Sequence, residues 1–132
     1  MAERISLEVP ATLSALSTVR MVLGGLGAGL GYSLEDLEDL SLATEGLFHA
    51  ALQSEACERF SVEVVISDGA LTVYSGEFRS AALRKQVEVG DEGCLDLCRL
   101  LRGTVDEVGC RETDDAYQVV LVKRSRGMST PE

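Results

Sequence analysis

The feature that most restricts the fold is the dipeptide Asp68-Gly69, which stands between two segments rich in β-branched residues. Asp-Gly favours the tight turn that joins two antiparallel strands. We therefore predict a hairpin with strands near residues 60–66 and 71–74. This antiparallel pair in the middle of the chain is the element from which we predict the rest of the fold.

One strand and two helices are expected before this hairpin. Residues 5–9 alternate apolar and polar side chains, as a half-buried strand does. Leucine and valine then recur every three or four residues over 13–30, which predicts an amphipathic helix that Gly31 ends. Ser33 is expected to cap a second helix that runs to about Gln53.

The second half of the chain is expected to be richer in strands. Periodicity is lost over residues 75–93, and a short helix is expected near 95–101. Two more strands are predicted near 104–111 and 117–123. Strands that run in hairpins, with helices grouped between them, predict a two-layer α+β sandwich. Its mixed, mostly antiparallel sheet would be covered by helices on one face.

Composition favours a single soluble domain. The 132 residues carry a net charge of −10 and are 45% hydrophobic, which is typical of a globular chain. We expect one domain over residues 1–124 and a flexible tail over 125–132. The acidic balance argues against direct nucleic-acid binding. No stretch reaches the roughly 18 apolar residues of a membrane span, so we expect a cytoplasmic protein that does not bind membranes.

The four cysteines do not form a recognisable pattern. Cys94 and Cys98 lie four apart and could meet His49 or Cys110 at a zinc ion. The paired Cys-x-x-Cys spacing that is typical of zinc sites is absent, however. Packing in the core is the simpler interpretation of these residues.

Two groups on the second helix carry possible chemistry. Glu45 and His49 are four residues apart and share one face, where they could polarise a water or hold a metal ion. The simpler alternative is an exposed helical pair. The acidic residues over 35–39 are expected to form a solvated face, or else a surface that meets a basic partner.

A family resemblance enters at this helix. The segment over residues 32–50, Tyr-Ser-Leu-Glu-Asp-Leu-Glu-Asp-Leu-Ser-Leu-Ala-Thr-Glu-Gly-Leu-Phe-His-Ala, resembles the anti-sigma-factor serine kinases. These belong to the gyrase, histidine-kinase and mismatch-repair (GHKL) ATPase superfamily. The opening strand, Val9-Pro10-Ala11 and the helix ending in Gly31-Tyr32 match as well. The resemblance implies the Bergerat-type ATPase fold, with ATP and Mg²⁺ as cofactors.

Carried over to this chain, the resemblance makes Glu45 the catalytic glutamate, which positions the attacking hydroxyl or water. It places His49 where the family has the asparagine that holds magnesium. A neutral imidazole is a poor ligand for this hard cation, which prefers oxygen. His49 is therefore both a metal-site and a cofactor-site candidate, and it departs from the family pattern.

The other two nucleotide motifs are altered too. The adenine-binding Asp-x-Gly would fall at Ser75-Gly76, where the aspartate is missing. The phosphate-binding Gly-x-Gly-Leu would fall at Gly93 and Leu95, where Asp96 adds negative charge. With all three motifs altered, we expect the ATP site to be weakened or lost.

These observations favour an anti-sigma-factor-like regulator that acts by protein–protein interaction in bacterial transcription or stress-response control. Its partners would be a sigma factor or an antagonist protein, and the resemblance implies a homodimer. One alternative is an active ATP-dependent serine/threonine protein kinase that phosphorylates an antagonist. The other is a domain of the same fold that supports a homodimer or a larger assembly.

Overall fold

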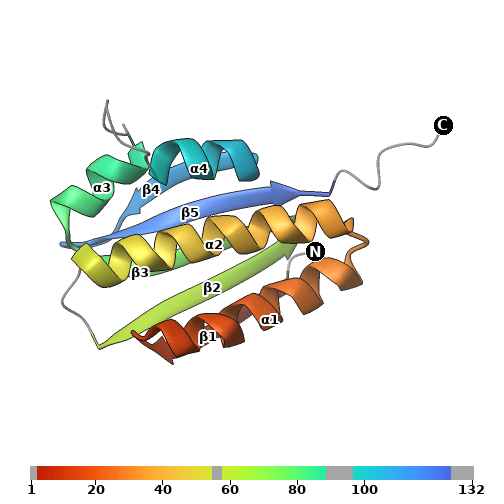
Figure 1. Cartoon of the computed structure of the whole chain (residues 1–132), viewed down its shortest axis with the longest axis horizontal. Helices are drawn as coiled ribbons and strands as arrows, with labels where there is room; N and C mark the ends of the chain where they lie inside the picture. Colours follow the sequence, from red (N-terminus) through yellow and green to blue (C-terminus); the bar gives the residue numbers. More distant parts are fainter. Residues whose placement is uncertain (1–2, 55–57, 89–96, 126–132) are drawn as a thin grey trace.

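The computed structural model describes residues 3–54, 58–88 and 97–125. Within these ranges the chain forms five strands and four helices (Figure 1). In chain order they are β1 (Glu3–Pro10), α1 (Leu13–Gly29), α2 (Leu34–Ser54), β2 (Arg59–Ser67), β3 (Ala70–Phe78), α3 (Ala81–Glu88), α4 (Leu97–Thr104), β4 (Glu107–Glu112) and β5 (Tyr117–Arg124).

The strands form one sheet in the order β1-β2-β3-β5-β4, and each of the four pairings is antiparallel among the described residues. The hairpin expected at Asp68-Gly69 is confirmed. Both turn residues have positive φ, 54° and 77°, which is the conformation that a tight two-residue hairpin turn requires. Glycine adopts it without steric cost.

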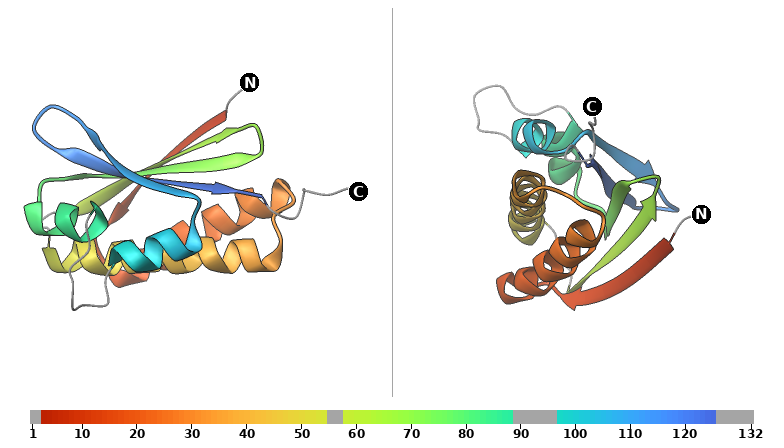
Figure 2. Two further views of the ribbon diagram at one scale, coloured as in Figure 1. Left: turned by 90° about the horizontal axis from the view of Figure 1, so that it is seen from above. Right: turned by 90° about the vertical axis from the view of Figure 1, so that its right-hand side faces the viewer.

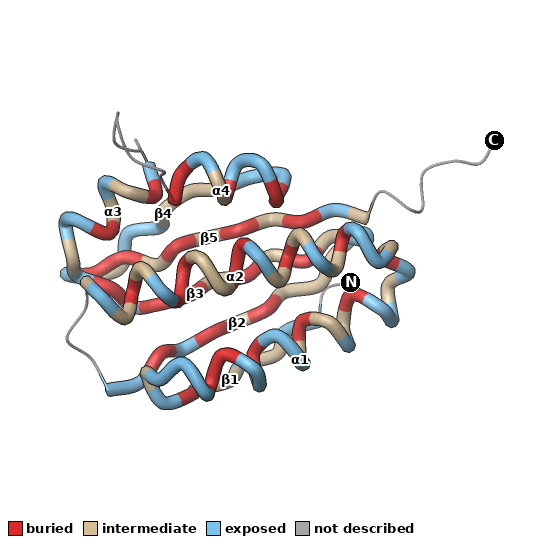
Figure 3. Tube along the Cα trace, in the orientation of Figure 1, coloured by how far each residue is buried: buried red, intermediate tan, exposed pale blue. Residues whose placement is uncertain are grey.

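The helices lie on one face of the sheet, and the other face carries none of the described helices (Figure 2). This arrangement confirms the two-layer α+β sandwich. The helices and the strands both contribute buried residues, red in Figure 3, and these form one hydrophobic core. A row of edge-to-face aromatic contacts runs through it, with ring centroids 5.2 Å apart for Phe48–Phe60, 5.7 Å for Phe60–Phe78 and 6.0 Å for Phe78–Tyr117. Such pairs stabilise a core beyond the area they bury.

The N-terminal end of α2 is held to the sheet by buried charges. Lys123 of β5 is fully buried, and its Nζ lies 3.7 Å from Asp36 Oδ1 and 3.5 Å from Asp39 Oδ2. The same Nζ donates a hydrogen bond of 2.9 Å to the Thr104 carbonyl. We call these four residues the Lys123 cluster. The expectation of a wholly solvated acidic face is therefore wrong for Asp36, which has 0% exposure.

Tyr32, between α1 and α2, joins the same end of the molecule to the sheet. Its hydroxyl accepts a hydrogen bond of 3.1 Å from the Leu71 backbone N–H and donates one to the Lys123 carbonyl. Burial is the main cause that raises the pKa of Tyr32 to about 12, and the nearby Asp36 charge adds to it. Ser33 then caps α2 as expected, accepting from the Asp36 N–H at 3.0 Å.

Two helical expectations need correction. Helix α3 was not predicted, although Ser80 caps its first turn and Leu83 and Val87 are buried from it. Helix α4 confirms the short helix expected near 95–101, but it runs on to Thr104. The tail expected over 125–132 lies outside the described residues except for Ser125.

None of the helices in the described ranges has the length and apolarity that crossing a membrane requires.

Candidate functional site

A pocket of about 550 Å³ opens between α2, α3 and α4. A volume of this size is within the range of small-molecule sites. Helix α2 contributes one wall through Gly46, His49, Ala50 and Gln53, which follow one another at spacings of three, one and three. That spacing places them on one face of the helix. Helix α2 lies beside α3 and α4 in the helical layer (Figures 1 and 2).

The opposite wall comes from the two short helices. Leu97, Arg99 and Leu100 of α4 face the pocket, and Gln86 of α3 completes the lining. The apolar part of the lining therefore comes from leucines on one side and from small residues on the other. The polar groups that the described residues contribute are two side-chain amides, one imidazole and one guanidinium.

Gly46 lets α4 approach α2 closely. A Cβ built at Gly46 would lie 2.4 Å from the Leu100 side chain, well inside contact distance. Glycine in the middle of a helix costs about 1 kcal/mol relative to alanine. The glycine stands where α2 meets α4. The pocket is therefore bounded on this side by a tight contact between the two helices.

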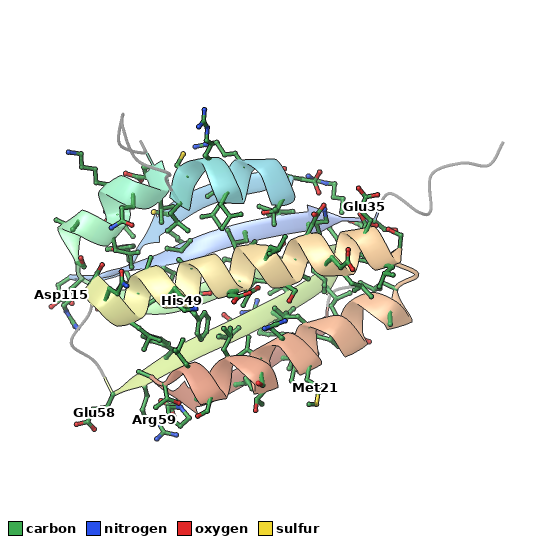
Figure 4. All side chains as sticks on the ribbon, in the orientation of Figure 1. Met21, Glu35, His49, Glu58, Arg59 and Asp115 are labelled. Carbon is green, nitrogen blue, oxygen red and sulfur yellow. The ribbon has the colours of Figure 1, made fainter. Side chains whose placement is uncertain are left out.

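Of the residues predicted to be catalytic or to hold a metal ion, one lines this pocket and the other does not. His49 is an exposed residue of α2, labelled in Figure 4, and it lines the pocket. Glu45 is half-buried on the same helix but is not among the lining residues. The structure therefore brings His49, and not Glu45, to the pocket.

The residues expected at the adenine end lie in the sheet. Ser75 is 2% exposed and shares the inward parity of Leu71 and Val73 on β3. Gly76 is also buried, and a Cβ there would lie 3.0 Å from the Tyr117 carbonyl oxygen of β5. Close packing of two strands therefore accounts for this glycine. Neither residue lines the pocket.

The remaining two candidates, Gly93 and Leu95, lie outside the described residues, as do Cys57 and Cys94. Cys98 is buried and accepts a hydrogen bond of 3.2 Å from Arg102. Cys110 is half-buried, and burial raises the pKa of its thiol to about 11. Over the part of the chain that the structure describes, no group of three or more His, Cys, Asp or Glu could hold a metal ion.

The donor set around the pocket does not match the needs of magnesium and ATP. Mg²⁺ prefers carboxylate and carbonyl oxygens. Among the described residues, the pocket lining contains no carboxylate, and the side-chain carbonyl oxygens there belong to Gln53 and Gln86 on different helices. Ser75, which was predicted at the adenine-binding motif without its aspartate, offers a buried hydroxyl and no carboxylate. The described residues therefore do not fit a magnesium–nucleotide complex.

The pocket residues that sequence analysis missed are on α3 and α4. Nothing local in the sequence marks Gln86 or Arg99, because they reach the pocket only through the packing of two short helices against α2. Gly46 did carry a signal, since a glycine inside a strong helical pattern points to a close approach.

Comparison with known proteins supports the fold. No family model matches the chain, and no curated protein matches it in sequence. Its structure is similar to the crystal structure of the RsbU and RsbW domains of Rv1364c from Mycobacterium tuberculosis, with a TM-score of 0.60 and 16% identity. The two share a fold. The match covers 93% of this chain and 32% of that one, so the chain spans about a third of its length.

Proposed function

We propose that this chain is an anti-sigma-factor-like regulator that binds a protein partner in the cytoplasm without turning over ATP. The observation that carries the proposal is the pocket lining. In a fold shared with the structure of the RsbU and RsbW domains, the residues of α2 that line the pocket beside α3 and α4 are Gly46, His49, Ala50 and Gln53, which supply an imidazole and no carboxylate. A regulator that acts by occupying its partner does not need this site to bind magnesium.

The solvent-facing side of α2 supports protein binding. Leu34 is 72% exposed and Leu42 is 49% exposed, with the exposed Glu38 midway between them. Residues spaced by four form a continuous stripe on a helix. Met21 of α1 is also 72% exposed, and it lines a groove together with Leu37 and Glu38 of α2. We call the surface formed by Leu34, Glu38 and Leu42 the Leu34 stripe. An apolar, acidic surface suits a partner with apolar and basic side chains, such as a sigma factor or an antagonist protein.

Binding experiments test this proposal directly. The immobilised chain is titrated with the sigma factors and antagonist-type proteins of its host, with and without ATP and Mg²⁺. We expect at least one partner to bind, with an affinity that nucleotide does not change. The double change Leu34→Ser and Leu42→Ser should weaken binding about tenfold or more, since apolar anchors dominate such interfaces. Leu13→Ser, an exposed leucine at the start of α1, is the matched control.

The kinase alternative rests on Glu45, which lies one turn before His49 on α2. Incubation with radiolabelled ATP and candidate antagonists distinguishes the two functions. Phosphoryl transfer that disappears in Glu45→Ala would replace the regulator proposal by the kinase.

Homodimerisation is a separate part of the proposal. The sheet face opposite the helices carries half-buried apolar side chains on β2 and β5, which flank β3, among them Val65, Val120 and Val122. No described helix covers them (Figure 2). Light scattering should then give twice the mass of the chain, and a monomer at all concentrations would remove this part. The net charge of −10 supports a protein partner rather than nucleic acid.

A further inference from the structure

Strand β4 forms one edge of the sheet. It pairs with β5 on one side, and the described residues supply no strand on its other side (Figure 1). The backbone N–H and C=O groups along such an edge can pair with a further strand, and natural edges are commonly protected by proline, lysine or a β-bulge. The sequence of β4 is Glu-Val-Gly-Cys-Arg-Glu, and its register with β5 is unbroken. This edge is therefore open to a matching strand.

The side chains of β4 alternate between the two faces of the sheet. Val108 and Cys110 are half-buried and pack against the core on the helix-covered face. Glu107, Gly109 and Arg111 lie on the open face. An apolar pair thus faces the helices, while an acidic and a basic residue flank a glycine on the other face.

This pattern is complementary to itself when two copies of β4 run antiparallel. With Gly109 opposite the partner's Gly109, each Glu107 lies opposite an Arg111, and each Val108 lies opposite a Cys110. Opposite charges and apolar side chains in directly opposed positions stabilise a strand pair. A shift by two residues in either direction separates the charges, so the pattern favours a single register.

The two charged residues keep capacity for a second partner. Glu107 accepts a hydrogen bond of 2.7 Å from Arg124, but its side chain is 58% exposed. Arg111 donates one of 2.7 Å to Gln118 and stacks over the Tyr74 ring at 4.5 Å. Since a guanidinium has five N–H donors, others remain. These contacts hold both charges on the open face, where the charges of a second β4 would meet them.

Gly109 distinguishes this edge from the other one. It is not among the glycines with positive φ, and a Cβ there would meet nothing within 4 Å. Neither conformation nor packing within one protomer therefore requires this glycine. A glycine inside a strand often marks the close approach of another backbone. The opposite edge, β1, also carries opposite charges, Arg4 and Glu8, but Ser6 stands between them and Pro10 ends the strand.

We propose that two copies of the chain pair through β4, antiparallel and centred on Gly109, so that their sheets join into one. This inference rests on the homodimer of the proposed function and assigns its contact to an edge of the sheet. It depends neither on ATP nor on the identity of the protein partner. Six residues a side form a small contact, so we expect a reversible dimer that forms as the concentration rises.

A charge exchange tests the register. In Glu107→Arg the new cation faces the partner's Arg111, and in Arg111→Glu the new carboxylate faces the partner's Glu107. Each variant alone should dimerise about tenfold more weakly than the wild type. An equimolar mixture restores both opposite-charge pairs, so it should dimerise as the wild type does. Sedimentation over a concentration series measures this, and a mixture that stays monomeric would overturn the proposal.

A lysine at the centre of the contact locates it. Gly109→Lys has room within one protomer but places two like charges opposite each other, so dimerisation should weaken about fivefold or more. Gly25→Lys is the matched control, because it adds the same charge at an equally open position on α1 and should change nothing. Ser6→Lys tests the β1 edge. Loss of the dimer in Ser6→Lys, with Gly109→Lys unaffected, would place the contact at β1 and overturn the proposal.

The remaining outcomes separate this inference from the proposed function. Circular dichroism establishes that each variant is folded. A dimer that no change at β4 weakens would have its contact elsewhere, such as on the open face, and would overturn this inference while the homodimer stands. A wild type that is monomeric at every concentration would remove both the inference and the homodimer. Binding of a sigma factor or an antagonist protein is measured separately, so the regulator proposal does not fail with either.

Discussion

The two ends of α2 face different environments. At the N-terminal end, Asp36 and Asp39 meet a fully buried lysine, and the bond to the Thr104 carbonyl adds a third contact. At the C-terminal end, Gly46 and Ala50 line a pocket of about 550 Å³. One helix therefore carries a closed, charged anchor at one end and an open, weakly polar surface at the other.

The difference teaches which end holds the fold together. A buried charge is costly unless it is paired, so the Lys123 cluster requires all its members. The polar side chains of the pocket reach solvent, so they do not need a partner within the protein. Sequence change is therefore restricted at the anchored end, while the open end is free to acquire a ligand or to lose one. The predictions below test this contrast, starting with the largest expected effect.

Lys123→Met should destabilise the protein most, by about 3–5 kcal/mol, because it leaves Asp36 buried without its cation. Urea unfolding followed by circular dichroism measures the loss. Lys85→Met, on the exposed side of α3, is the matched control and should change little. Adding Asp36→Asn should recover part of the loss, since the remaining buried group is then neutral. A loss below about 1 kcal/mol would refute the anchoring role of the cluster.

Tyr32 should give the fold an alkaline limit. The pKa of Tyr32 is raised to about 12 in the folded chain, whereas an unfolded tyrosine ionises near 10. The folded state therefore holds the proton more tightly, so this contribution to stability is complete below pH 10 and is lost as the pH rises from 10 to 12. Relative to Tyr32→Phe, the wild type should lose about 2–3 kcal/mol over this interval. Parallel pH curves for the two proteins would contradict the assignment.

Gly46→Leu tests how tightly α2 packs against α4 at the pocket. A leucine side chain there overlaps Leu100 and approaches Leu97, so these side chains or α4 itself must shift, at a cost of about 1–3 kcal/mol. Gly46→Ala should cost less, because its gain in helix propensity offsets part of the overlap. Gly24→Leu on α1 is the control, since nothing lies within 4 Å of a Cβ at that position. Equal stability of Gly46→Leu and Gly24→Leu would show that the contact is not tight.

Changes at the rim of the pocket should have the smallest effect. His49→Gln and Gln53→Ala are expected to alter the free energy of unfolding by no more than about 0.5 kcal/mol, because both side chains are exposed. Thermal unfolding measures this. A large loss in either variant would mean that the open end also holds the fold, and the contrast between the two ends would disappear.

Much of the fold follows from local patterns. The Asp68-Gly69 turn and the spacing of leucines in α1 and α2 were sufficient for the hairpin and both long helices. Helix α3 was missed because eight residues give only one repeat of the apolar spacing, Leu83 to Val87. Its capping residue, Ser80, was the remaining signal.

The buried lysine shows what a strand pattern can hide. Lys123 has the same parity on β5 as the buried Val119 and Leu121, so its position predicts an inward side chain. Its charge argues for the surface instead. Only the packing of α2 over that strand supplies the carboxylates that resolve the conflict. The pocket is similar: His49 was found from its spacing from Glu45 and from the family pattern, but Arg99 and Gln86 depend on how separate helices pack.

The place of β5 in the sheet has a consequence for synthesis on the ribosome. It is the last of the described strands in the chain, yet it lies between β3 and β4 and supplies the only described neighbour of β4. A nascent chain that ends before Tyr117 thus exposes one edge of β3 and leaves β4 without a partner. Exposed edges of this kind invite pairing with other chains. We therefore expect incomplete chains that lack β5 to aggregate more readily than the complete chain.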